Sequence, residues 1–363
     1  MKKTKLLIIT VVIGLSLVLS SCVQQGPRVT GAPGLAVKDE TIFVSYGSFI
    51  TAMNAESHAV EWSFPESRDP KILFFAPPLV TDEFVYVGDL SNKFYKLDRE
   101  TGKAIWTFAD AKGFYIGQAA VDESAVYAPS NDGNLYVIDQ DGKNLWAFET
   151  GHYLWAQPQL SEEVVYAASM DHFVYAISKS DGKQLWRQEM GGAVNGAPVL
   201  SEDGSILYVG SLGKEMVALD TKNEGKKLWV YPPETSEDSI ESVWGKPILG
   251  KGTLYFADSG GYLYALDATS GKLVWPAPIE FPGTVVGGLT ALEDGFVYAT
   301  EEGGIAARNF DGTIKWERQV DGEIFQAPVV SGNYLVVGTI NGEKLVYLYD
   351  LEGNRIWAET PEK

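Results

Sequence analysis

The stretch Ala265-Leu-Asp-Ala-Thr-Ser-Gly-Lys-Leu-Val-Trp275 decides the fold, because related versions of it recur along the 363-residue chain. The tryptophans that end these versions lie 40 to 46 residues apart. They are Trp62, Trp106, Trp146, Trp186, Trp229, Trp275, Trp316 and Trp357. A repeat of this length that is built from strands is typical of a β-propeller, in which each repeat forms one blade.

The repeat that contains this stretch divides into four short runs of β-branched, aromatic and aliphatic residues, separated by turns with Gly or Asp. The runs are Lys246–Leu249, Thr253–Ala257, Tyr262–Leu266 and Gly271–Trp275. They are too short for helices and have the composition of strands. The sequence therefore predicts an all-β, eight-bladed propeller of four-stranded antiparallel blades.

The tryptophan of each repeat lies on the outermost strand, where we expect its ring to pack against the neighbouring blade. Burying an indole side chain removes about 150–250 Å² of surface from water, which at about 25 cal/mol per Å² stabilises the fold by roughly 4–6 kcal/mol before the loss of conformational entropy is counted. A glycine four residues before most of these tryptophans can adopt the positive φ that the turn requires. One blade cannot bury both of its faces, so this packing is predicted to hold the ring together.

The blades are expected to begin with short strands near the axis of the ring. These lie at Leu35–Val37, Ala76–Val80, Ala119–Val121, Gln157–Leu160, Ala197–Leu200, Lys246–Leu249, Leu289–Leu292 and Ala327–Val330. Both ends of the repeat region complete their own blades, which leaves two arrangements for closing the ring. Either Arg28–Thr30 adds an edge strand, or the first and last blades pack through side chains alone.

Residues 1–21 are predicted to be a lipoprotein signal peptide. They contain a basic segment, Met1–Lys5, an apolar run from Leu6 to Leu19, and small residues directly before Cys22. Leu19-Ser-Ser-Cys22 resembles a bacterial lipobox, which implies that Cys22 is the lipid attachment site. The alternative is an ordinary signal peptide in which Cys22 has no role.

Three segments follow from this interpretation: the signal peptide, a lipidated tether over residues 22–34 that is rich in Gly and Pro, and the propeller over residues 35–363. We therefore expect an extracytoplasmic protein that is held at a membrane by its acyl anchor. That membrane is the outer membrane, with the protein facing the periplasm, or the cell surface if the source has no outer membrane.

The chain is strongly acidic, with a formal net charge of −19. Such a surface repels nucleic acid and anionic lipid, so we expect no nucleic-acid partner. Many of the acidic residues lie in turns, such as Ser161-Glu-Glu163, where they also account for solubility.

The residue types that carry catalysis or bind metals are scarce. The three histidines, His58, His152 and His172, have no spacing that suggests a zinc site, and Cys22 is the only thiol. Loop carboxylates that could serve a Ca²⁺ site by converging from several blades are equally normal in β-turns. They are Asp89, Asp132, Asp171 and Asp258. We expect no catalytic residues and no metal site.

The repeats, as in Leu207-Tyr-Val-Gly-Ser211 and Tyr262-Leu-Tyr-Ala-Leu-Asp267, resemble those first described in pyrroloquinoline-quinone (PQQ) alcohol dehydrogenases. The resemblance covers Leu35 to Trp357. With a lipobox and a single domain, the chain looks most like the BamB group of outer-membrane assembly lipoproteins. That resemblance implies a non-catalytic scaffold that binds a membrane protein or complex, such as a β-barrel assembly protein, through loops on one face.

No interface residue can be carried over from that group. Its partner-binding loop carries Leu and Arg, whereas the central connections Glu189–Asn195 and Ser236–Ser242 contain no Arg. Two alternatives stay open. One is a quinone- or small-molecule-binding propeller, although quinoprotein dehydrogenases are nearly twice as long and commonly carry two adjacent cysteines, so we expect no PQQ with Ca²⁺. The other is a cell-surface module that binds polysaccharide or protein.

A set of mostly aromatic residues precedes the first strands and is the candidate partner- or ligand-binding rim. It comprises Phe74, Tyr115, Tyr153, Trp155, Asn195, Trp244 and Phe325. Connections between blades are expected to lie on the same face as the turns between strands two and three, so these side chains should surround one mouth of the central channel. Aromatic residues on such a concave surface are typical of peptide and flat-ligand sites. Alternatively, they fill the space between blades.

Overall fold

The computed structural model describes residues 31–236 and 239–361. The predicted signal peptide, Cys22 and the Arg28–Thr30 segment lie outside these residues. Within the described ranges, no helix has the length and hydropathy of a membrane span.

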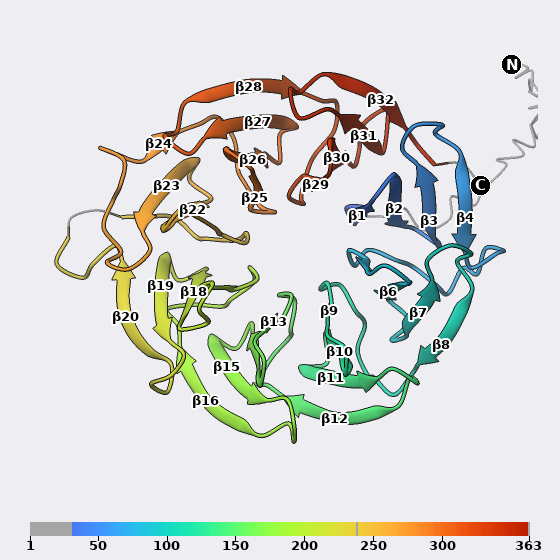
Figure 1. Cartoon of the computed structure of the whole chain (residues 1–363), viewed down its shortest axis with the longest axis horizontal. Coiled ribbons are helices and arrows are strands. Elements are labelled where there is room, and N and C mark those ends of the chain that lie inside the picture. The colour runs from blue at the N-terminus through green and yellow to red at the C-terminus, as the bar shows by residue number, and fades with distance from the viewer. Residues whose placement is uncertain (1–30, 237–238, 362–363) are drawn as a thin grey trace, which may run out of the picture. The chain divides into compact units, whose positions relative to one another are not determined.

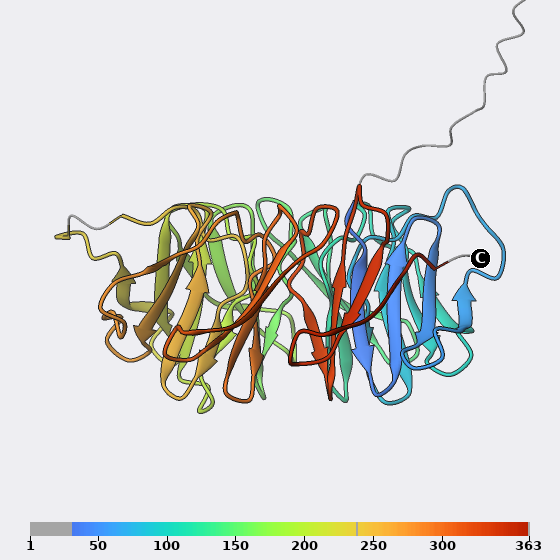
Figure 2. The ribbon, with the colours of Figure 1, turned by 90° about the horizontal axis from the view of Figure 1, so that it is seen from above.

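Eight four-stranded antiparallel sheets surround a central opening, and each sheet consists of four consecutive strands paired in sequence order (Figure 1). The strands run between the two faces of the ring, so the turns and connections lie at these faces (Figure 2). The predicted all-β, eight-bladed propeller is therefore confirmed.

Blades one to four occupy residues 34–189. Their strands are β1 (Gly34–Lys38), β2 (Thr41–Tyr46), β3 (Phe49–Asn54), β4 (Val60–Phe64), β5 (Leu79–Val80), β6 (Phe84–Gly88), β7 (Phe94–Asp98), β8 (Ala104–Phe108), β9 (Ala120–Val121), β10 (Ala125–Pro129), β11 (Asn134–Asp139), β12 (Asn144–Glu149), β13 (Gln159–Leu160), β14 (Val164–Ala168), β15 (Phe173–Ser178) and β16 (Gln184–Glu189).

Blades five to eight occupy residues 199–359. Their strands are β17 (Val199–Leu200), β18 (Ile206–Ser211), β19 (Glu215–Asp220), β20 (Lys226–Tyr231), β21 (Ile248–Gly250), β22 (Thr253–Ala257), β23 (Tyr262–Asp267), β24 (Ile279–Glu280), β25 (Leu289–Leu292), β26 (Gly295–Ala299), β27 (Gly304–Asn309), β28 (Ile314–Gln319), β29 (Val329–Ser331), β30 (Tyr334–Gly338), β31 (Val346–Tyr349) and β32 (Arg355–Glu359).

The outermost strand of blade six differs from the prediction. The segment Gly271–Trp275 is not a regular strand, and β24 instead pairs with β23 only at Ile279 and Glu280. Pro276 and Pro278 follow the predicted strand and lack the N–H groups that a regular β-ladder requires. Trp275 is buried nevertheless, and its indole N–H donates a hydrogen bond to the backbone oxygen of Phe310 in blade seven at 3.2 Å.

The tryptophans of the repeat join neighbouring blades. Within the described ranges, seven of the eight donate a hydrogen bond from Nε1 to a backbone oxygen of the next blade. Trp62, for example, donates to the oxygen of Arg99 at 2.8 Å. Each such contact satisfies the polar edge of the indole while the ring excludes water from the interface between the sheets.

A glycine of the next blade packs against most of these rings. Gly102 has φ of 69°, and a Cβ atom there would lie 2.4 Å from Cε3 of Trp62. The glycine is required for two reasons, namely the positive φ and the closeness of the indole.

Packing between blades eight and one closes the ring through side chains. Trp357 donates a hydrogen bond from Nε1 to the backbone oxygen of Ala55 at 2.7 Å. His58 occupies the position that glycine holds elsewhere, with φ of 63°, and its ring centroid lies 5.0 Å from that of Trp357. Apolar residues of both blades form one buried cluster behind this contact, including Val44, Met53 and Leu348. Within residues 31–236 and 239–361, blades eight and one therefore meet through side chains, whereas Arg28–Thr30, the edge strand of the other arrangement, lies outside these residues.

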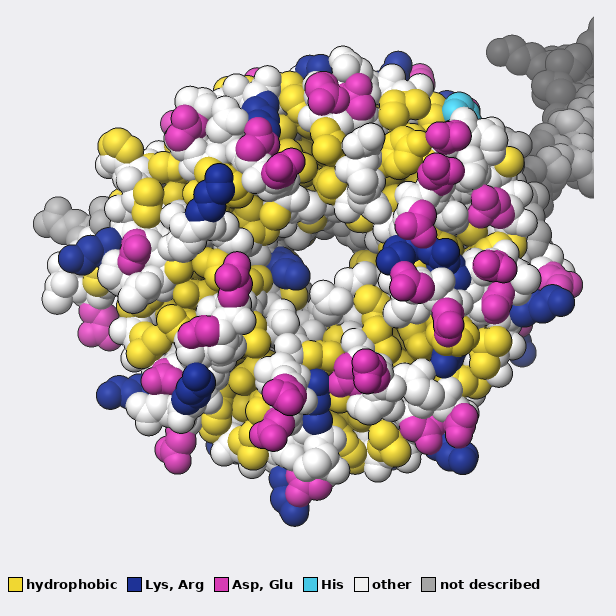
Figure 3. Space-filling model, viewed as in Figure 1, with side chains coloured by type: hydrophobic (Ala, Val, Ile, Leu, Met, Phe, Trp, Pro, Cys, Tyr) yellow, Lys and Arg dark blue, Asp and Glu magenta, His cyan; other side chains and the backbone are white. Residues whose placement is uncertain are grey.

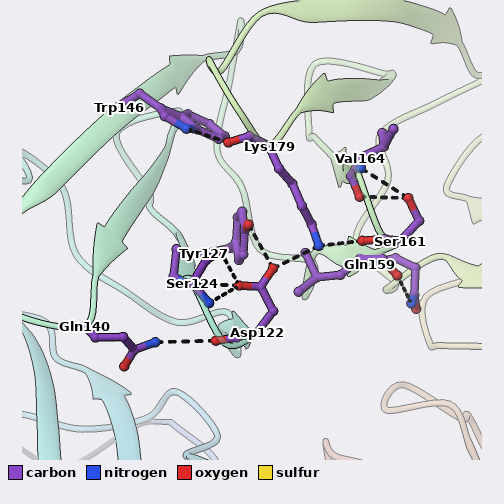
Figure 4. A network of polar contacts seen from close by, with 11 residues as sticks. Asp122, Ser124, Tyr127, Gln140, Trp146, Gln159, Ser161, Val164 and Lys179 are labelled. Atoms are coloured by element: carbon purple, nitrogen blue, oxygen red, sulfur yellow. Dashed lines mark hydrogen bonds and ion pairs between the residues drawn. The ribbon is translucent and has the colours of Figure 1, made fainter.

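A polar network joins blades three and four (Figure 4). The carboxylate of Asp122 accepts hydrogen bonds from Ser124 and from the hydroxyl of Tyr127, and it forms a 2.9 Å ion pair with Nζ of Lys179. Lys179 also donates to the backbone oxygen of Ser161. Burial raises the pKa of Asp122, but the hydrogen bonds from Ser124 and Lys179 outweigh burial and hold this pKa below its ordinary value.

Candidate functional site: the central cavity

A cavity of about 590 Å³ lies where the first strands of the blades and the connections that lead into them meet. All eight blades contribute to its wall, from Leu35 in blade one to Val330 in blade eight. Figure 3 shows the opening at the centre of the ring, with acidic side chains spread over the surrounding face. The propeller therefore offers one concave site on its axis.

Four of the predicted rim residues line this cavity, namely Trp155, Asn195, Trp244 and Phe325. They are half-buried and lie in the connections that lead into blades four, five, six and eight. Gly117 and Gly287 also line the cavity, in the connections that lead into blades three and seven. Four of the seven predicted rim residues therefore meet at the axis.

The placement of Phe74 and Tyr115 at the rim was wrong. Both side chains are completely buried. The ring centroid of Phe74 lies 5.8 Å from that of Tyr95, and the ring centroid of Tyr115 lies 5.3 Å from that of Phe94. Both therefore fill space within and between blades, which is the alternative that the sequence left open.

Tyr153 lies at the surface beside the cavity. Its side chain is 40% exposed, and its ring stacks on Trp155 with centroids 6.0 Å apart and planes inclined by 16°. The indole N–H of Trp155 donates a 2.8 Å hydrogen bond to Oδ1 of Asn131, which holds the ring in place. Tyr153 and Trp155 thus form an aromatic surface that leads from the exterior into the cavity.

Glycines allow neighbouring connections to approach closely around the cavity. A Cβ atom on Gly245 would lie 2.2 Å from Cα of Gly288, and Gly288 has φ of 93°. Any side chain at Gly245 would force these two connections apart, so the narrow wall depends on glycine there.

Polar side chains of the wall hold adjacent blades together. Gln118 donates to the backbone oxygen of Pro78 at 2.9 Å, and Gln157 donates to that of Ala119 at 3.0 Å. Thr290 donates in the same way to Pro328 at 2.6 Å. These donors are therefore occupied by contacts between blades.

Lys246 is a charged lining residue that was not among the predicted rim residues. It directly precedes Pro247, the position held by Gln118 or Gln157 in other blades, and its side chain remains accessible to solvent within the open cavity. The surrounding walls displace part of the water around its ammonium group, and this desolvation lowers the pKa of Lys246 below its ordinary value. The signal was present in the sequence, because Lys246 lies two residues after the predicted rim residue Trp244.

The loop carboxylates belong to turns and do not converge. Asp132 accepts hydrogen bonds from the backbone N–H groups of Lys112 and Gly113, in the connection before its blade, and from the hydroxyl of Tyr136. Burial raises the pKa of Asp132, but these and other hydrogen bonds lower it below its ordinary value. Asp89, Asp171 and Asp258 each accept a hydrogen bond from a tyrosine of their own blade in the same way. Asp132, Asp171 and Asp258 also accept hydrogen bonds from backbone N–H groups of the preceding connection and so fix it to the blade.

The histidines are separate from the cavity. His152 and His172 are exposed, and His58 lies at the contact between blades one and eight. Within residues 31–236 and 239–361, no group of three or more His, Cys, Asp or Glu side chains is arranged to hold a metal ion.

Comparison with protein families gives a match along most of the chain. The model of the family described as outer membrane protein assembly factor BamB matches residues 20–152, 131–286 and 283–363. The chain belongs to the BamB family.

Curated members of the BamB family are distant relatives of this chain. BamB of Burkholderia pseudomallei (strain K96243) is 24% identical over 213 residues, which cover 56% of this chain and 55% of that protein. BamB of Escherichia coli (strain K12) is 34% identical over 94 residues, covering 23% of this chain and 24% of that protein. The matched region thus spans about half the length of the Burkholderia relative.

Solved structures with the same fold include BamB from Moraxella catarrhalis. It has a TM-score of 0.74 and 16% sequence identity, over 87% of this chain and 96% of that chain. The computationally designed protein Ika8 has a TM-score of 0.75 and 13% identity, over 90% of this chain and 98% of that chain. A designed protein matches as well as a natural BamB, so structural likeness supports the fold and says nothing about function.

Proposed function

We propose that this chain is a membrane-anchored, non-catalytic scaffold for protein–protein interaction in the assembly of outer-membrane proteins. The observation that carries the proposal is the match of the BamB family model, in three segments, to residues 20–363. The relatives in Burkholderia pseudomallei and Escherichia coli are named as outer membrane protein assembly factors. We extend that role to this chain.

In this proposal Cys22 carries the acyl anchor, and residues 22–34 tether the propeller to the membrane. The protein then lies at the outer membrane and faces the periplasm. Pro33 and Gly34, at the end of this segment, are buried against the propeller, and Gly34 is the first residue of β1.

The surface that we propose for partner binding contains Tyr153 and Trp155. Tyr153 is exposed, and the ring of Trp155 is fixed by its hydrogen bond to Asn131. A rigid aromatic pair loses little conformational entropy when it binds, which is why such residues dominate the binding energy of many interfaces. The net charge of −19 favours a partner with a basic surface.

Site-specific crosslinking in native membranes tests the proposal. A photo-crosslinking amino acid replaces Tyr153 in the full-length protein, and the matched control carries it at Leu145, which is 54% exposed on the outer strand β12. We expect Tyr153 to form an adduct with a protein of the β-barrel assembly machinery and Leu145 to form none. Equal labelling at both positions, or no protein adduct at Tyr153, would refute this binding surface.

Recovery of the complex tests the scaffold role independently of the surface. The lipidated protein, solubilised from the same membranes, should co-purify with a β-barrel assembly protein. Purification without such a partner, from membranes that contain the machinery, would contradict the proposed function itself.

A further inference from the structure

The cavity wall has one charged side chain in a protein whose net charge is −19, and that side chain is a cation. Among the described residues that line the cavity, Lys246 is the one that carries a charge, and the acidic residues lie elsewhere. Lysine also differs from the residues at the equivalent position in other blades, such as Pro77, Gln118 and Gln157. The cavity is therefore a concave surface that could attract an anion.

The ammonium group of Lys246 is not used by the fold. Within the described chain it has no hydrogen bond or ion pair, whereas Gln118 and Gln157 at the equivalent position bond to the neighbouring blade. Burial lowers its pKa, and no neighbouring carboxylate acts against this effect. An anion placed beside Lys246 would offset the cost of holding the charge there.

The same cavity presents three aromatic side chains from different blades. Trp155, Trp244 and Phe325 lie in the connections that lead into blades four, six and eight, so aromatic surface occurs on several sides of the axis. The volume of about 590 Å³ falls within the ordinary range of small-molecule sites, roughly 300–1,000 Å³. A flat ring can therefore enter and contact an aromatic wall while a charged group reaches Lys246.

We propose that the central cavity binds a carboxylate borne by an aromatic group, with the carboxylate at Lys246 and the ring against Trp155, Trp244 or Phe325. The carboxylate can belong to a free aromatic acid or to the last residue of a polypeptide that ends in an aromatic side chain. This ligand site goes beyond the scaffold function and does not depend on it.

Two matched probes test the proposal on the purified full-length protein. N-acetyl-L-phenylalanine carries the ring and the carboxylate, and N-acetyl-L-phenylalanine amide carries the same ring without the charge. Ligand-observed NMR should show binding of the acid and weaker binding of the amide by roughly tenfold or more, the value of a charge-assisted contact. Equal binding of the two probes, or no binding of the acid at millimolar concentration, would overturn the proposal.

Variants locate the site. Lys246→Met keeps the aliphatic stem and should weaken binding of the acid to the level of the amide, while Lys246→Arg should retain it. Lys251→Met is the matched control, because Lys251 is an exposed lysine of the same blade that does not line the cavity. The same loss in Lys246→Met and Lys251→Met would also overturn the proposal.

A competition experiment distinguishes a free aromatic acid from the C-terminus of a polypeptide as the source of the carboxylate. A short peptide with a C-terminal phenylalanine should compete with N-acetyl-L-phenylalanine if the cavity accepts the end of a chain. Failure of this peptide to compete, with the free acid still bound, assigns the cavity to small aromatic acids.

Discussion

The indole of Trp357 donates a hydrogen bond to the backbone oxygen of Ala55, a residue 302 positions earlier in the sequence, at 2.7 Å. The same contact joins Trp316 to the backbone oxygen of Leu351 within the continuous part of the ring. The junction between the last and first blades is thus built like the other junctions, although no peptide connection crosses it. Closure therefore depends on the energy of one such packing interface.

Replacing Trp357 with Ala should lower the free energy of unfolding by about 3–5 kcal/mol, because a buried indole is lost and a cavity remains. Urea unfolding of the purified protein measures the change. Ile356 is the neighbouring control, since its side chain is 49% exposed and Ile356→Ala should change stability by less than about 0.5 kcal/mol. A loss below about 1 kcal/mol for Trp357→Ala would mean that this ring does not close the propeller.

Replacing either of two positive-φ glycines with alanine should lower the free energy of unfolding, but by different amounts. Gly102→Ala places a Cβ atom 2.4 Å from the ring of Trp62, whereas Gly252, with φ of 78°, has no atom within 4 Å of that position. Gly252→Ala should lower the free energy of unfolding by about 1–2 kcal/mol, because alanine is strained at a positive φ. Gly102→Ala should lower it by about 1–3 kcal/mol more, because the indole ring of Trp62 must also move. Equal costs by urea unfolding would exclude the contact with the indole as the reason for glycine.

The Asp122–Lys179 pair predicts a pH-dependent stability. The folded-state pKa of Asp122 is depressed, so its contribution is present above the unfolded-state pKa of about 3.9 and is lost as the pH falls towards the folded-state value. Lys179→Met should therefore destabilise the protein more near about pH 7 than near about pH 2.

A surface pair supplies the control for that experiment. Lys183 pairs with Asp181, and their side chains are 80% and 43% exposed, so Lys183→Met should have little effect at either pH. If Lys179→Met lowers the free energy of unfolding equally at both pH values, the ion pair with Asp122 is not the reason for the destabilisation.

Replacing Trp155 and Trp244 together with Ala should abolish partner capture in the crosslinking experiment and leave the fold intact. Both side chains are half-buried at the cavity rather than between sheets, so the loss of unfolding free energy should be smaller than for Trp357→Ala. Crosslinking yield and urea unfolding are measured on the same preparation. A protein that unfolds in this variant would show that the two rings fill structural space instead of binding a partner.

Cys22→Ser should release the protein from the membrane fraction, because the thioether to the lipid can no longer form. Fractionation of cells, with mass spectrometry of the N-terminal peptide, detects both the location and the acyl group. The control Gln25→Ser changes a residue of the tether and should leave the protein in the membrane fraction. Retention of Cys22→Ser in that fraction would argue against the lipobox interpretation.

The repeat period and the turn glycines were sufficient to predict the blade count and the junction tryptophans, because both follow from local strand chemistry. The broken outer strand of blade six was also predictable from Pro276 and Pro278, which the repeat pattern obscured. Phe74 was placed at the rim because it lies three residues before Pro77. Pro78, however, is the proline that directly precedes β5, as Pro158 precedes β13, so Phe75 rather than Phe74 occupies the position of Trp155. Phe74 corresponds to Leu154, and both side chains are buried.

Lys246 was missed for another reason. A lysine beside a turn ordinarily extends into solvent, and only the closure of the ring brings this one to the axis. The candidate cavity is thus built from eight segments that lie far apart in the sequence, and four of the seven predicted rim residues line it.

Because side chains join the first and last blades, the fold does not depend on where in the ring the chain begins and ends. Because β1 to β4 and β29 to β32 form complete sheets of their own, no hydrogen-bonded strand would be lost if the propeller were opened at a different connection. A circular permutant that links residue 359 to residue 34 and begins within the connection after Glu189 would retain all eight sheets. The order of the blades around the ring, rather than the point at which the chain starts, is what this sequence encodes.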